Sequence, residues 1–547
     1  MGRQQFSVIR AVVFDFDGTL TRPGSIDFDG IKKAIGCPPE LPILEFVYSL
    51  QTARERTEAL RVLDGYELEA AKISEPDVEA EDLIRFLRSR SLPLAIVSRN
   101  SRSSILRALD NFPSVTAADF DAIISRDDAR PKPDPEGIVL AATKIGVQVE
   151  HVLVVGDYVF DVEAAQKANA PSVLVARDPV SFTLAQPPDR TISRLGELKD
   201  IVEYVRPLPC GKLPNHFLTR FLEEFPVDDP SVVVRPGLGE DTAAVQLAEG
   251  EEVIVLKSDP ITFATDRLGY YSVAINANDV ATSGADPRWF LTTLLFPAGS
   301  SACQIHAVMR EIEQASRAVG ISLCGGHTEI TDSVTRVVAV GQLVGTVSRE
   351  LLIDKRRMST GDRVLLTKGV AVEGTAVLAR EFPSELKALG MNASEVEASK
   401  DFLFQPGISI LKEARLAART PGVTAMHDVT EGGLATALEE LSVAGRHRIR
   451  VSRDRIPIYP ETRKICSLLG IDPLGLLGSG SLLITCRPEV CNDLTRSLCS
   501  ADVEVVSVGE VLGEGVGIEA DGEDGGRGEW PKFEVDELPL AMERLRG

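Results

Sequence analysis

Short apolar runs alternate with helix-patterned segments over residues 1–200. The runs lie at residues 11–14, 94–98, 121–124, 151–157 and 171–176. Short apolar strands separated by helices are typical of a parallel sheet that helices cover on both faces. The pattern therefore predicts an α/β domain, and in such a domain ligands bind beyond the carboxyl ends of the strands.

Polar residues stand where these strands end. They are Asp15 and Asp17, Ser98, Lys132 in the proline-flanked "RPKPDP", and Asp157 with Asp161. Residues i and i+2 of a strand share one side, so Asp15 and Asp17 repel each other unless they are solvated or lie beside a cation such as Mg²⁺. The stretch alone leaves a solvated loop and a catalytic site both open, but all six residues are expected to converge on one crevice.

Composition narrows the choice of function. A chain of 547 residues suggests several domains, and 44% hydrophobic with 26% charged residues is ordinary for globular proteins. A formal charge of −22 argues against binding to nucleic acid or to anionic membrane. The eight cysteines form no CxxC pair, and the N-terminus has no apolar signal core, so a cytoplasmic location is expected.

The pattern of apolar and polar residues changes after the proline-bearing linker at residues 205–214. Long strands are expected to mix with loops rich in glycine, asparagine and acidic residues, at 237–245, 256–263, 274–287, 324–331, 365–379 and 426–438. No GxxxxGK[ST] loop occurs, so a nucleotide would be bound without a P-loop. Asp241, Asp259 and Asp279 carry carboxylates suited to Mg²⁺.

The motifs of the first part, in their order, resemble the haloacid dehalogenase (HAD) phosphohydrolase superfamily over about residues 8–190. The four motifs are DFDGT, the strand end at Ser98, Lys132, and GDYVFD. The resemblance implies a Rossmann-like domain at 1–200 with a phosphoglycolate phosphatase-like activity. The charged, helix-patterned insert at about 22–91 would be the small helical cap that restricts substrates to small phosphate esters.

This resemblance also implies a role for each motif residue. Asp15 would attack phosphorus to form an aspartyl phosphate, and Asp17 would protonate the leaving oxygen and then activate water. Ser98 and Lys132 would hold phosphoryl oxygens. Mg²⁺ would be held by Asp15, Asp17 through its backbone carbonyl, and Asp157, with Asp161 in support.

The second part resembles the superfamily of aminoimidazole ribonucleotide (AIR) synthetase, selenophosphate synthetase, thiamine monophosphate kinase and HypE, also called PurM-like. The similarity spans about residues 211–515 and is closest to HypE-like proteins, through "GEDTAAV", "NANDVATSGADP", "GGHTEIT" and "EGGLATA". It implies an α+β module of two domains, 201–350 and 351–547, that binds ATP with Mg²⁺, forms a homodimer through its N-terminal domains and phosphorylates a small acceptor.

The same resemblance implies a nucleotide site. Metal and phosphates would be held by Asp241, Asp259, Asn278 and Asp279. The nucleotide or acceptor site would be lined by Gly325, Gly326, His327 and Glu329, and closed by Lys368, Asp428, Glu431, Gly432 and Gly433. Each could instead be a structural residue: the histidine a hydrogen-bonded loop residue, the glycines the start of a helix.

Two departures bear on the function of the second part. HypE proteins act on a C-terminal cysteine, whereas this chain ends "LPLAMERLRG" and its last cysteine is Cys499. The glycine-rich lead segment with reactive cysteine of selenophosphate synthetases is matched only faintly, and Cys210 is interpreted as incidental.

The sequence therefore predicts a bifunctional enzyme: a magnesium-dependent phosphatase for a small phosphorylated metabolite, joined to an ATP-dependent module. The alternative is that the second module is catalytically silent and serves as a nucleotide sensor or a dimerisation element for the phosphatase. A third possibility is a kinase of a small metabolite, which would transfer the γ-phosphate to an acceptor and not to water.

Overall fold

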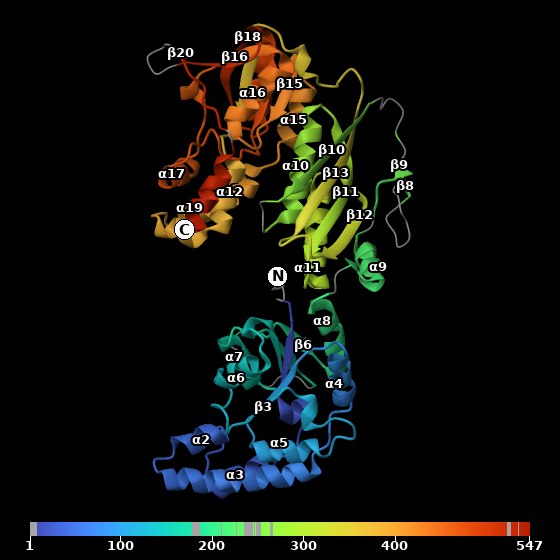
Figure 1. Cartoon of the computed structure of the whole chain (residues 1–547), viewed down its shortest axis with the longest axis vertical. Coiled ribbons are helices and arrows are strands. Elements are labelled where there is room, and N and C mark those ends of the chain that lie inside the picture. Colours follow the sequence, from blue (N-terminus) through green and yellow to red (C-terminus); the bar gives the residue numbers. More distant parts are fainter. Residues whose placement is uncertain are drawn as a thin grey trace. The chain divides into compact units, whose positions relative to one another are not determined.

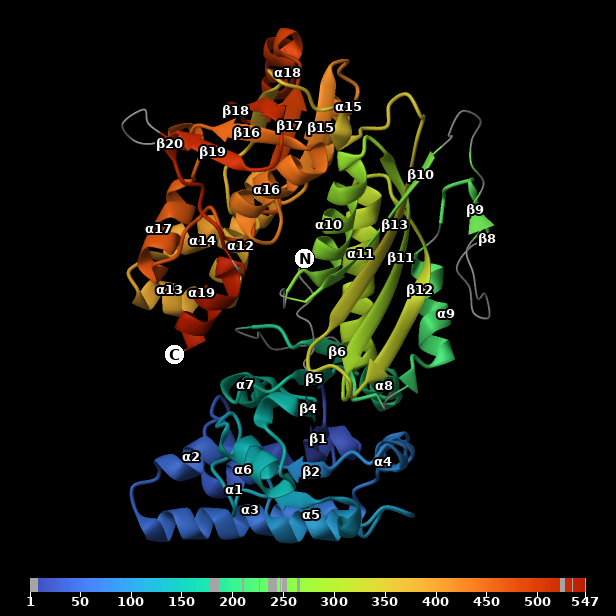
Figure 2. The same cartoon turned by 45° about the horizontal axis from the view of Figure 1, so that its top comes forward.

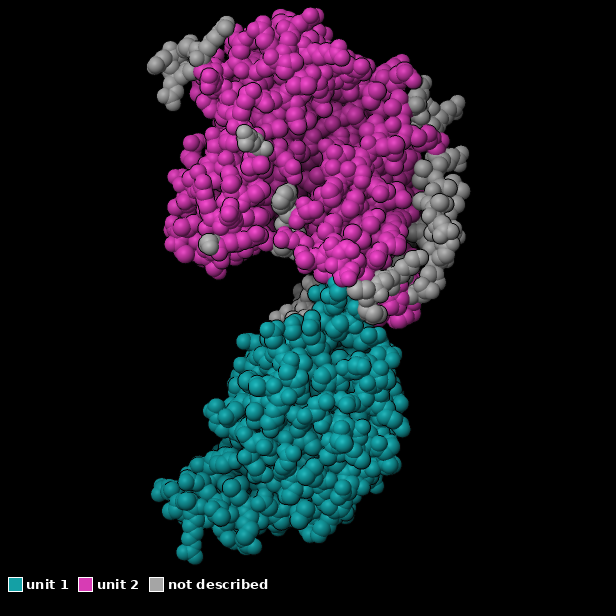
Figure 3. All heavy atoms as spheres, in the orientation of Figure 1, with its two compact units in different colours: residues 1–210, 298–305 teal, residues 211–297, 306–547 magenta. Residues whose placement is uncertain are grey.

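The computed structural model describes residues 8–177, 186–208, 211–225, 227–234, 244–245, 247, 253–262, 266–521, 527–533 and 535–546. The chain divides into two compact units, one of residues 1–210 with 298–305, the other of residues 211–297 with 306–547 (Figure 3). Asp241 and Cys210 lie outside the described residues. No helix in the described part of the chain is long and apolar enough to cross a membrane.

The first unit is built on a six-stranded sheet in the order β3-β2-β1-β4-β5-β6. Figure 1 labels its two end strands, β3 and β6. The strands are β1 (Ala11–Phe14), β2 (Leu94–Val97), β3 (Ala122–Ile124), β4 (Val152–Gly156), β5 (Ser172–Val175) and β6 (Arg190–Ile192). All neighbours pair in parallel, as the apolar runs predict. Since β1 lies between β2 and β4, the chain reverses its winding direction beside β1, where a crevice is expected.

Helices cover both faces of this sheet. Their bounds are α4 (Ala80–Ser89), α5 (Arg102–Leu109), α6 (Glu136–Ile145), α7 (Val159–Lys167) and α8 (Leu198–Val205). Val12 and Phe14 of β1 belong to one apolar core, and Ala11 and Val13 to the other. Both faces are thus buried, which explains why the strands read as continuous apolar runs.

A helical cap formed by α1 (Phe28–Ile35), α2 (Ile43–Ser49) and α3 (Ala53–Ile73) follows β1. Its own core contains Ile31, Val47 and Leu63. The insert predicted at about 22–91 is too long, because α4 belongs to the sheet layer. Apolar residues of α4 spaced three and four apart pack into the core beneath the sheet, namely Ala80, Leu83, Ile84 and Leu87.

Ion pairs from two arginines, Arg126 and Arg99, join the cap to the sheet layer. Arg126, two residues after β3, pairs with Asp64 and with Glu67 of α3, and the side chains of Arg126 and Glu67 are almost fully buried. Glu67 also accepts a hydrogen bond from the backbone N–H of Ser101 (3.1 Å). Arg99 makes a bidentate pair with Glu45 of α2, with N–O distances of 2.9 and 2.7 Å, and this pair is partly exposed.

The second unit contains a five-stranded sheet, ordered β10-β13-β11-β12-β7. Its strands are β7 (Gly211–Lys212), β10 (Val253–Ile261), β11 (Asp286–Pro297), β12 (Ser322–Thr331) and β13 (Val338–Val347). The helices α10 (Leu268–Thr282) and α11 (Ala302–Ala318) lie along one face of this sheet (Figure 2). The helix α9 (Asn215–Glu224) follows β7, and β8 (Val232–Val234) pairs with β9 (Ala244–Val245).

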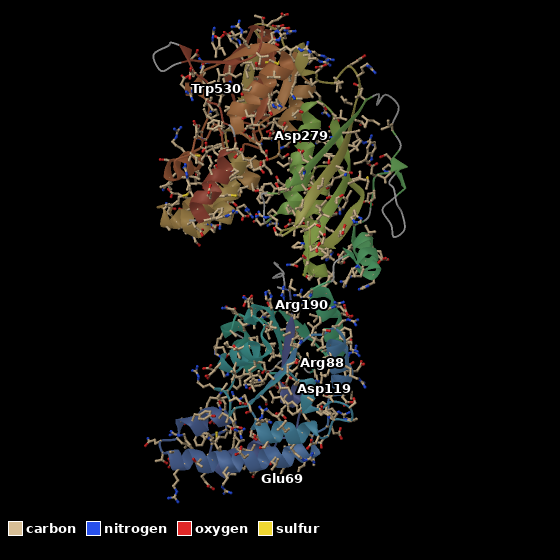
Figure 4. All side chains as sticks on the ribbon, in the orientation of Figure 1. Glu69, Arg88, Asp119, Arg190, Asp279 and Trp530 are labelled. Carbon is tan, nitrogen blue, oxygen red and sulfur yellow. The ribbon has the colours of Figure 1, made fainter. Side chains whose placement is uncertain are left out.

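A seven-stranded sheet follows, ordered β15-β17-β14-β18-β16-β19-β20. Its strands are β14 (Arg363–Thr367), β15 (Val423–Asp428), β16 (His447–Val451), β17 (Leu482–Cys486), β18 (Val505–Glu514), β19 (Ile518–Asp521) and β20 (Arg527–Gly528). The helices are α12 (Val372–Glu381), α13 (Pro383–Ala388), α14 (Ala393–Asp401), α15 (Leu411–Ala418), α16 (Gly433–Gly445), α17 (Pro460–Leu469), α18 (Pro488–Ser500) and α19 (Glu537–Arg546). Trp530, labelled in Figure 4, packs into the core beneath this sheet and donates a hydrogen bond to the carbonyl of Ala435 (3.1 Å).

Several segments predicted as loops in this unit are regular elements. Asp259 lies within β10, Asn278 and Asp279 lie within α10, and residues 325–329 lie within β12. Tertiary packing overrides the low strand or helix propensity of glycine, asparagine and aspartate there. Gly326 has a packing reason, because a Cβ atom at this position would lie 2.0 Å from the carbonyl oxygen of Thr292.

Candidate functional site

The strand-end residues of the first unit converge as predicted. Asp15 follows β1 directly, and Lys132 reaches it from the loop before α6, with 2.5 Å between the lysine Nζ and Asp15 Oδ1. The same Nζ lies 2.6 Å from Asp161 Oδ1, at the start of α7. Burial alone would lower the pKa of Lys132. The charges of Asp15 and Asp161 have a larger effect in the opposite direction and raise this pKa, so the lysine stays positively charged.

Three carboxylates gather around this lysine. Asp15, Asp157 and Asp161 each offer one oxygen, and these oxygens lie within 4.8 Å of one another. The hydroxyl of Thr19 donates to Asp157 (3.1 Å), and the backbone N–H of Tyr158 donates to Asp161 (3.0 Å). Burial, above all, raises the pKa of Asp15 well above its ordinary value and that of Asp157 to about 6. The three carboxyl groups can carry more negative charge than one lysine neutralises. Their oxygen atoms are ligands of the kind that a hard divalent cation such as Mg²⁺ prefers.

Asp17 lies in the tight turn η1 (Phe16–Leu20), where its side chain accepts a hydrogen bond from the amide of Asn100. Burial, followed by the negative charges of Glu67 and Asp157, raises the pKa of Asp17 to about 7. A carboxyl group in this range can both give and take a proton near neutral pH.

Ser98 ends β2 and is almost fully buried beside the same space. Its backbone N–H donates to the carbonyl of Ile124 (3.0 Å), and its hydroxyl accepts from the backbone N–H of Asn100 (3.2 Å). Ser98 therefore has a fixed position at the carboxyl end of the sheet, with a hydroxyl proton left to donate.

A cavity of about 440 Å³ joins these residues to the cap. Asp15, Asp17, Ser98, Lys132, Asp157 and Asp161 line its sheet end. Side chains of α1, α2 and α3 line the opposite end. The volume is within the range of small-molecule sites, about 300–1,000 Å³.

In the second unit, an acidic cluster forms where α10 meets β10. Lys257 Nζ lies 3.0 Å from Asp259 and 3.2 Å from Asp279, which Figure 4 labels. Asp428, at the end of β15, is almost fully buried, and its Oδ2 has no hydrogen-bond partner among the described residues. Burial and then the charge of Asp428 raise the pKa of Asp279 to about 8. The orphaned oxygen and the shared negative charge fit a site for a cation.

Two residues predicted to bind ATP have partners within the protein. The amide of Asn278 donates to the carbonyl of Ile408 (2.8 Å) and accepts from the N–H of Ile410 (2.9 Å). Lys368 pairs with the buried Glu413 (3.0 Å), and donates to the carbonyls of Gly407 (3.1 Å) and Ser409 (2.7 Å). One ion pair and two backbone carbonyls thus hold the ammonium group of Lys368 in place within this unit.

The other expected ATP residues lie apart. Gly325, Gly326, His327 and Glu329 are on β12, three strands from β10 in the sheet order, and strands are about 4.8 Å apart. Within one chain, these four residues of β12 therefore do not lie beside the acidic cluster. Gly432 and Gly433 have positive φ and begin α16 after the exposed Glu431, and the N–H of Gly432 donates to Asp536 (2.7 Å).

Comparison with known families assigns both parts of the chain. The family of haloacid dehalogenase-like hydrolases matches residues 9–169. The N-terminal and C-terminal domains of AIR synthase related proteins match residues 239–347 and 359–521. The chain joins a haloacid dehalogenase-like hydrolase domain to an AIR synthase related module. Both family resemblances predicted from the motifs are thereby confirmed.

Individual relatives match one part each. Carbamoyl dehydratase HypE of Cupriavidus necator is 27% identical over 289 residues, which are 51% of this chain and 78% of HypE. An uncharacterized hydrolase of Saccharomyces cerevisiae is 27% identical over 206 residues, 38% of this chain and 94% of that protein. The crystal structure of hydrogenase maturation protein HypE in complex with ATP has a TM-score of 0.50 and 20% identity, and covers 60% of this chain and 96% of HypE. That likeness shows the fold of the AIR synthase related module.

The hydrolase domain also contains site residues that the motifs did not single out. Asn100 holds Asp17, and Arg177 donates to the backbone carbonyl of Thr19 (3.2 Å); Thr19, the last residue of the DFDGT motif, was given no role but holds Asp157. Asn100 lies two residues after Ser98, which is a signal that sequence reasoning could have used. Arg177 comes from the end of a strand distant in sequence, and only the fold brings it here.

Proposed function

We propose that the hydrolase domain cleaves phosphate monoesters through an aspartyl phosphate on Asp15. The observation that carries this proposal is the position of Lys132 between Asp15 and Asp161 at the sheet end of the cavity. A buried cation that touches the nucleophile is suited to hold an anionic phosphoryl group against it.

Each residue at the sheet end of the cavity has its own role in the proposed reaction. A carboxylate oxygen of Asp15 forms a bond to phosphorus while the bond to the ester oxygen breaks, and the protonated Asp17 gives its proton to the leaving alcohol. Asp17 then takes a proton from water, whose oxygen attacks phosphorus and releases Asp15 and inorganic phosphate. Ser98 and Lys132 hold the phosphoryl oxygens. Bound by Asp15, Asp157 and the carbonyl of Asp17, with Asp161 in support, Mg²⁺ would offset the repulsion between carboxylate and phosphate.

We propose that the AIR synthase related module binds Mg-ATP at Asp259, Asp279 and Asp428 and phosphorylates a small acceptor. The orphaned, buried oxygen of Asp428 and the solved HypE–ATP complex support this proposal. Asp241 lies outside the described residues and remains a predicted ligand. A homodimer through β10 is also proposed, because Ile254 and Leu256 expose 49% and 72% of their surface on one side of this terminal strand.

Phosphate release by the full chain tests the first activity, and ATP turnover tests the second. The full chain is expected to release phosphate from small esters with Mg²⁺ and to stop when the metal is chelated. ATP consumption that requires an added acceptor would support acceptor phosphorylation, and ATP binding without turnover would favour the sensor alternative. Light scattering should give twice the mass of one chain if the dimer proposal is correct.

Gly18→Ala is expected to lower phosphatase activity by on the order of a hundredfold, because it displaces an acid of the site. Gly18 has a φ of +81°, and a Cβ atom there would lie 2.3 Å from Asp157 Oδ2. Gly36→Ala is the matched control, since Gly36 has a φ of +71° and no heavy atom within 4 Å of its Cβ position.

The rate of phosphate release measures the effect of each substitution on activity, and urea unfolding measures its effect on stability. Both variants should lose about 1 kcal/mol of unfolding free energy through the strained backbone, and only Gly18→Ala should lose activity. Equal activity in the two variants would show that the position of Asp157 does not matter for the reaction.

A further inference from the structure

The cap end of the cavity differs in chemistry from the sheet end. Large apolar side chains line it from the cap and from the segment after β4. They are Phe28, Ile43, Leu44 and Leu63, with Tyr158 and Phe160. Phe28, at the start of α1, exposes 57% of its surface, although α1 has an apolar face packed in the cap core. Together with its apolar neighbours, Phe28 gives this end of the cavity a wall that fits an apolar ligand.

The aromatic wall contributed by the sheet layer is held in place. The rings of Tyr158 and Phe160 pack edge to face, with 5.1 Å between their centroids. The guanidinium of Arg99 lies 4.6 Å from the centroid of the Phe160 ring. Arg99 is held both by Glu45 and by the backbone carbonyl of Lys132, so the Phe160 ring has a cationic partner on one side.

The charged side chains at this end already have protein partners. Glu67 is paired with Arg126, Arg99 with Glu45, and Arg22 with Glu75 (2.6 Å). Lys32 donates to the carbonyl of Pro39 (2.5 Å). A polyhydroxylated ester would lose hydrogen bonds to water here and would have to compete for these groups, which is costly.

We propose that this site selects phosphate monoesters whose organic part is apolar, of the size of a benzyl or branched alkyl group. The inference rests on the proposed phosphate-ester hydrolysis and names its substrate class. The phosphoryl group lies at the Asp15–Lys132 end, and the organic group contacts Phe28, Leu63 and the aromatic wall. An ester as small and anionic as phosphoglycolate would leave this apolar part of the cavity unfilled.

Four esters of primary alcohols test the proposal with the full chain and Mg²⁺, because their leaving oxygens are chemically alike. Benzyl phosphate and 3-methylbutyl phosphate represent the apolar class, and glycerol 1-phosphate and glucose 6-phosphate represent the polyol class. The apolar esters are expected to have kcat/KM values about tenfold or more above those of the polyol esters.

Phe28→Ala is expected to lower kcat/KM for benzyl phosphate about tenfold and to leave glycerol 1-phosphate within about twofold. Tyr48→Ala is the matched control, because Tyr48 is an exposed aromatic residue of the cap (46%) that does not line the cavity. It should change neither value.

The outcomes separate this inference from the proposed function. A preference for the polyol esters, or a preference for apolar esters that Phe28→Ala leaves intact, overturns the inference while phosphate-ester hydrolysis stands. Failure to hydrolyse any phosphate ester overturns the proposed function and the inference together.

Discussion

Asp15→Asn is expected to lower phosphate-ester hydrolysis by about four orders of magnitude or more, because a neutral amide is not a nucleophile toward phosphorus. The fold should persist, since asparagine has the same shape and Lys132 keeps its contact with Asp161. The rate of phosphate release and the thermal unfolding transition of the full chain measure the two properties.

Asp110→Asn is the control for this substitution. Asp110 caps the end of α5, its side chain is 72% exposed, and it should tolerate the same change without loss of activity. Substantial turnover by Asp15→Asn would exclude the aspartyl-phosphate mechanism, whatever the identity of the ester.

The double substitution Asp259→Ala with Asp279→Ala is expected to weaken Mg-ATP binding on the order of a hundredfold. The two carboxylates are the acids that Lys257 bridges, and without them one lysine and Asp428 are left to meet the metal and the triphosphate. Calorimetric titration of the full chain with Mg-ATP measures the affinity. Phosphatase activity should stay within about twofold, because the hydrolase residues are not altered.

Asp286→Ala controls for the loss of an acid from the same domain. Asp286 begins β11, its side chain is 53% exposed, and it pairs with Arg415 (2.9 Å) away from the cluster. If the double variant bound Mg-ATP as tightly as Asp286→Ala does, the acidic cluster would not be the nucleotide site.

The hydrolase fold and the convergence of its strand-end residues on one cavity could be predicted from the sequence, because parallel sheets obey simple rules. Buried strands are continuous apolar runs, and their carboxyl ends lie along one edge. Asp15, Ser98 and Asp157 were therefore predicted to meet, and they do. The boundary of the cap was wrong, because the amphipathic pattern of α4 shows that one face is buried but does not show against which layer.

The AIR synthase related module was less predictable from pattern alone. α10 is buried around most of its surface, so its sequence lacks the period of a surface helix, and Asn278 and Asp279 look like loop residues. Lys257 was missed, although it lies two residues before Asp259 on the same side of β10. The contacts of Lys368 with Glu413 and the carbonyl of Ser409 could not be predicted, because these residues lie about forty positions away in the sequence.

The two attachments of the cap differ in strength, and this difference sets how the cap can open. Arg126 and Glu67 are buried together, and separating them would leave an uncompensated charge at a cost of about 3–5 kcal/mol. The partly exposed pair of Arg99 with Glu45 contributes about 0–1 kcal/mol, and Arg99 keeps its contact with the Lys132 carbonyl when Glu45 leaves. Because α1, α2 and α3 share one apolar core, we expect them to move together, as a one-sided hinge: the cap turns about the buried attachment of α3, and its Glu45 side swings outward to admit the ester and release the alcohol.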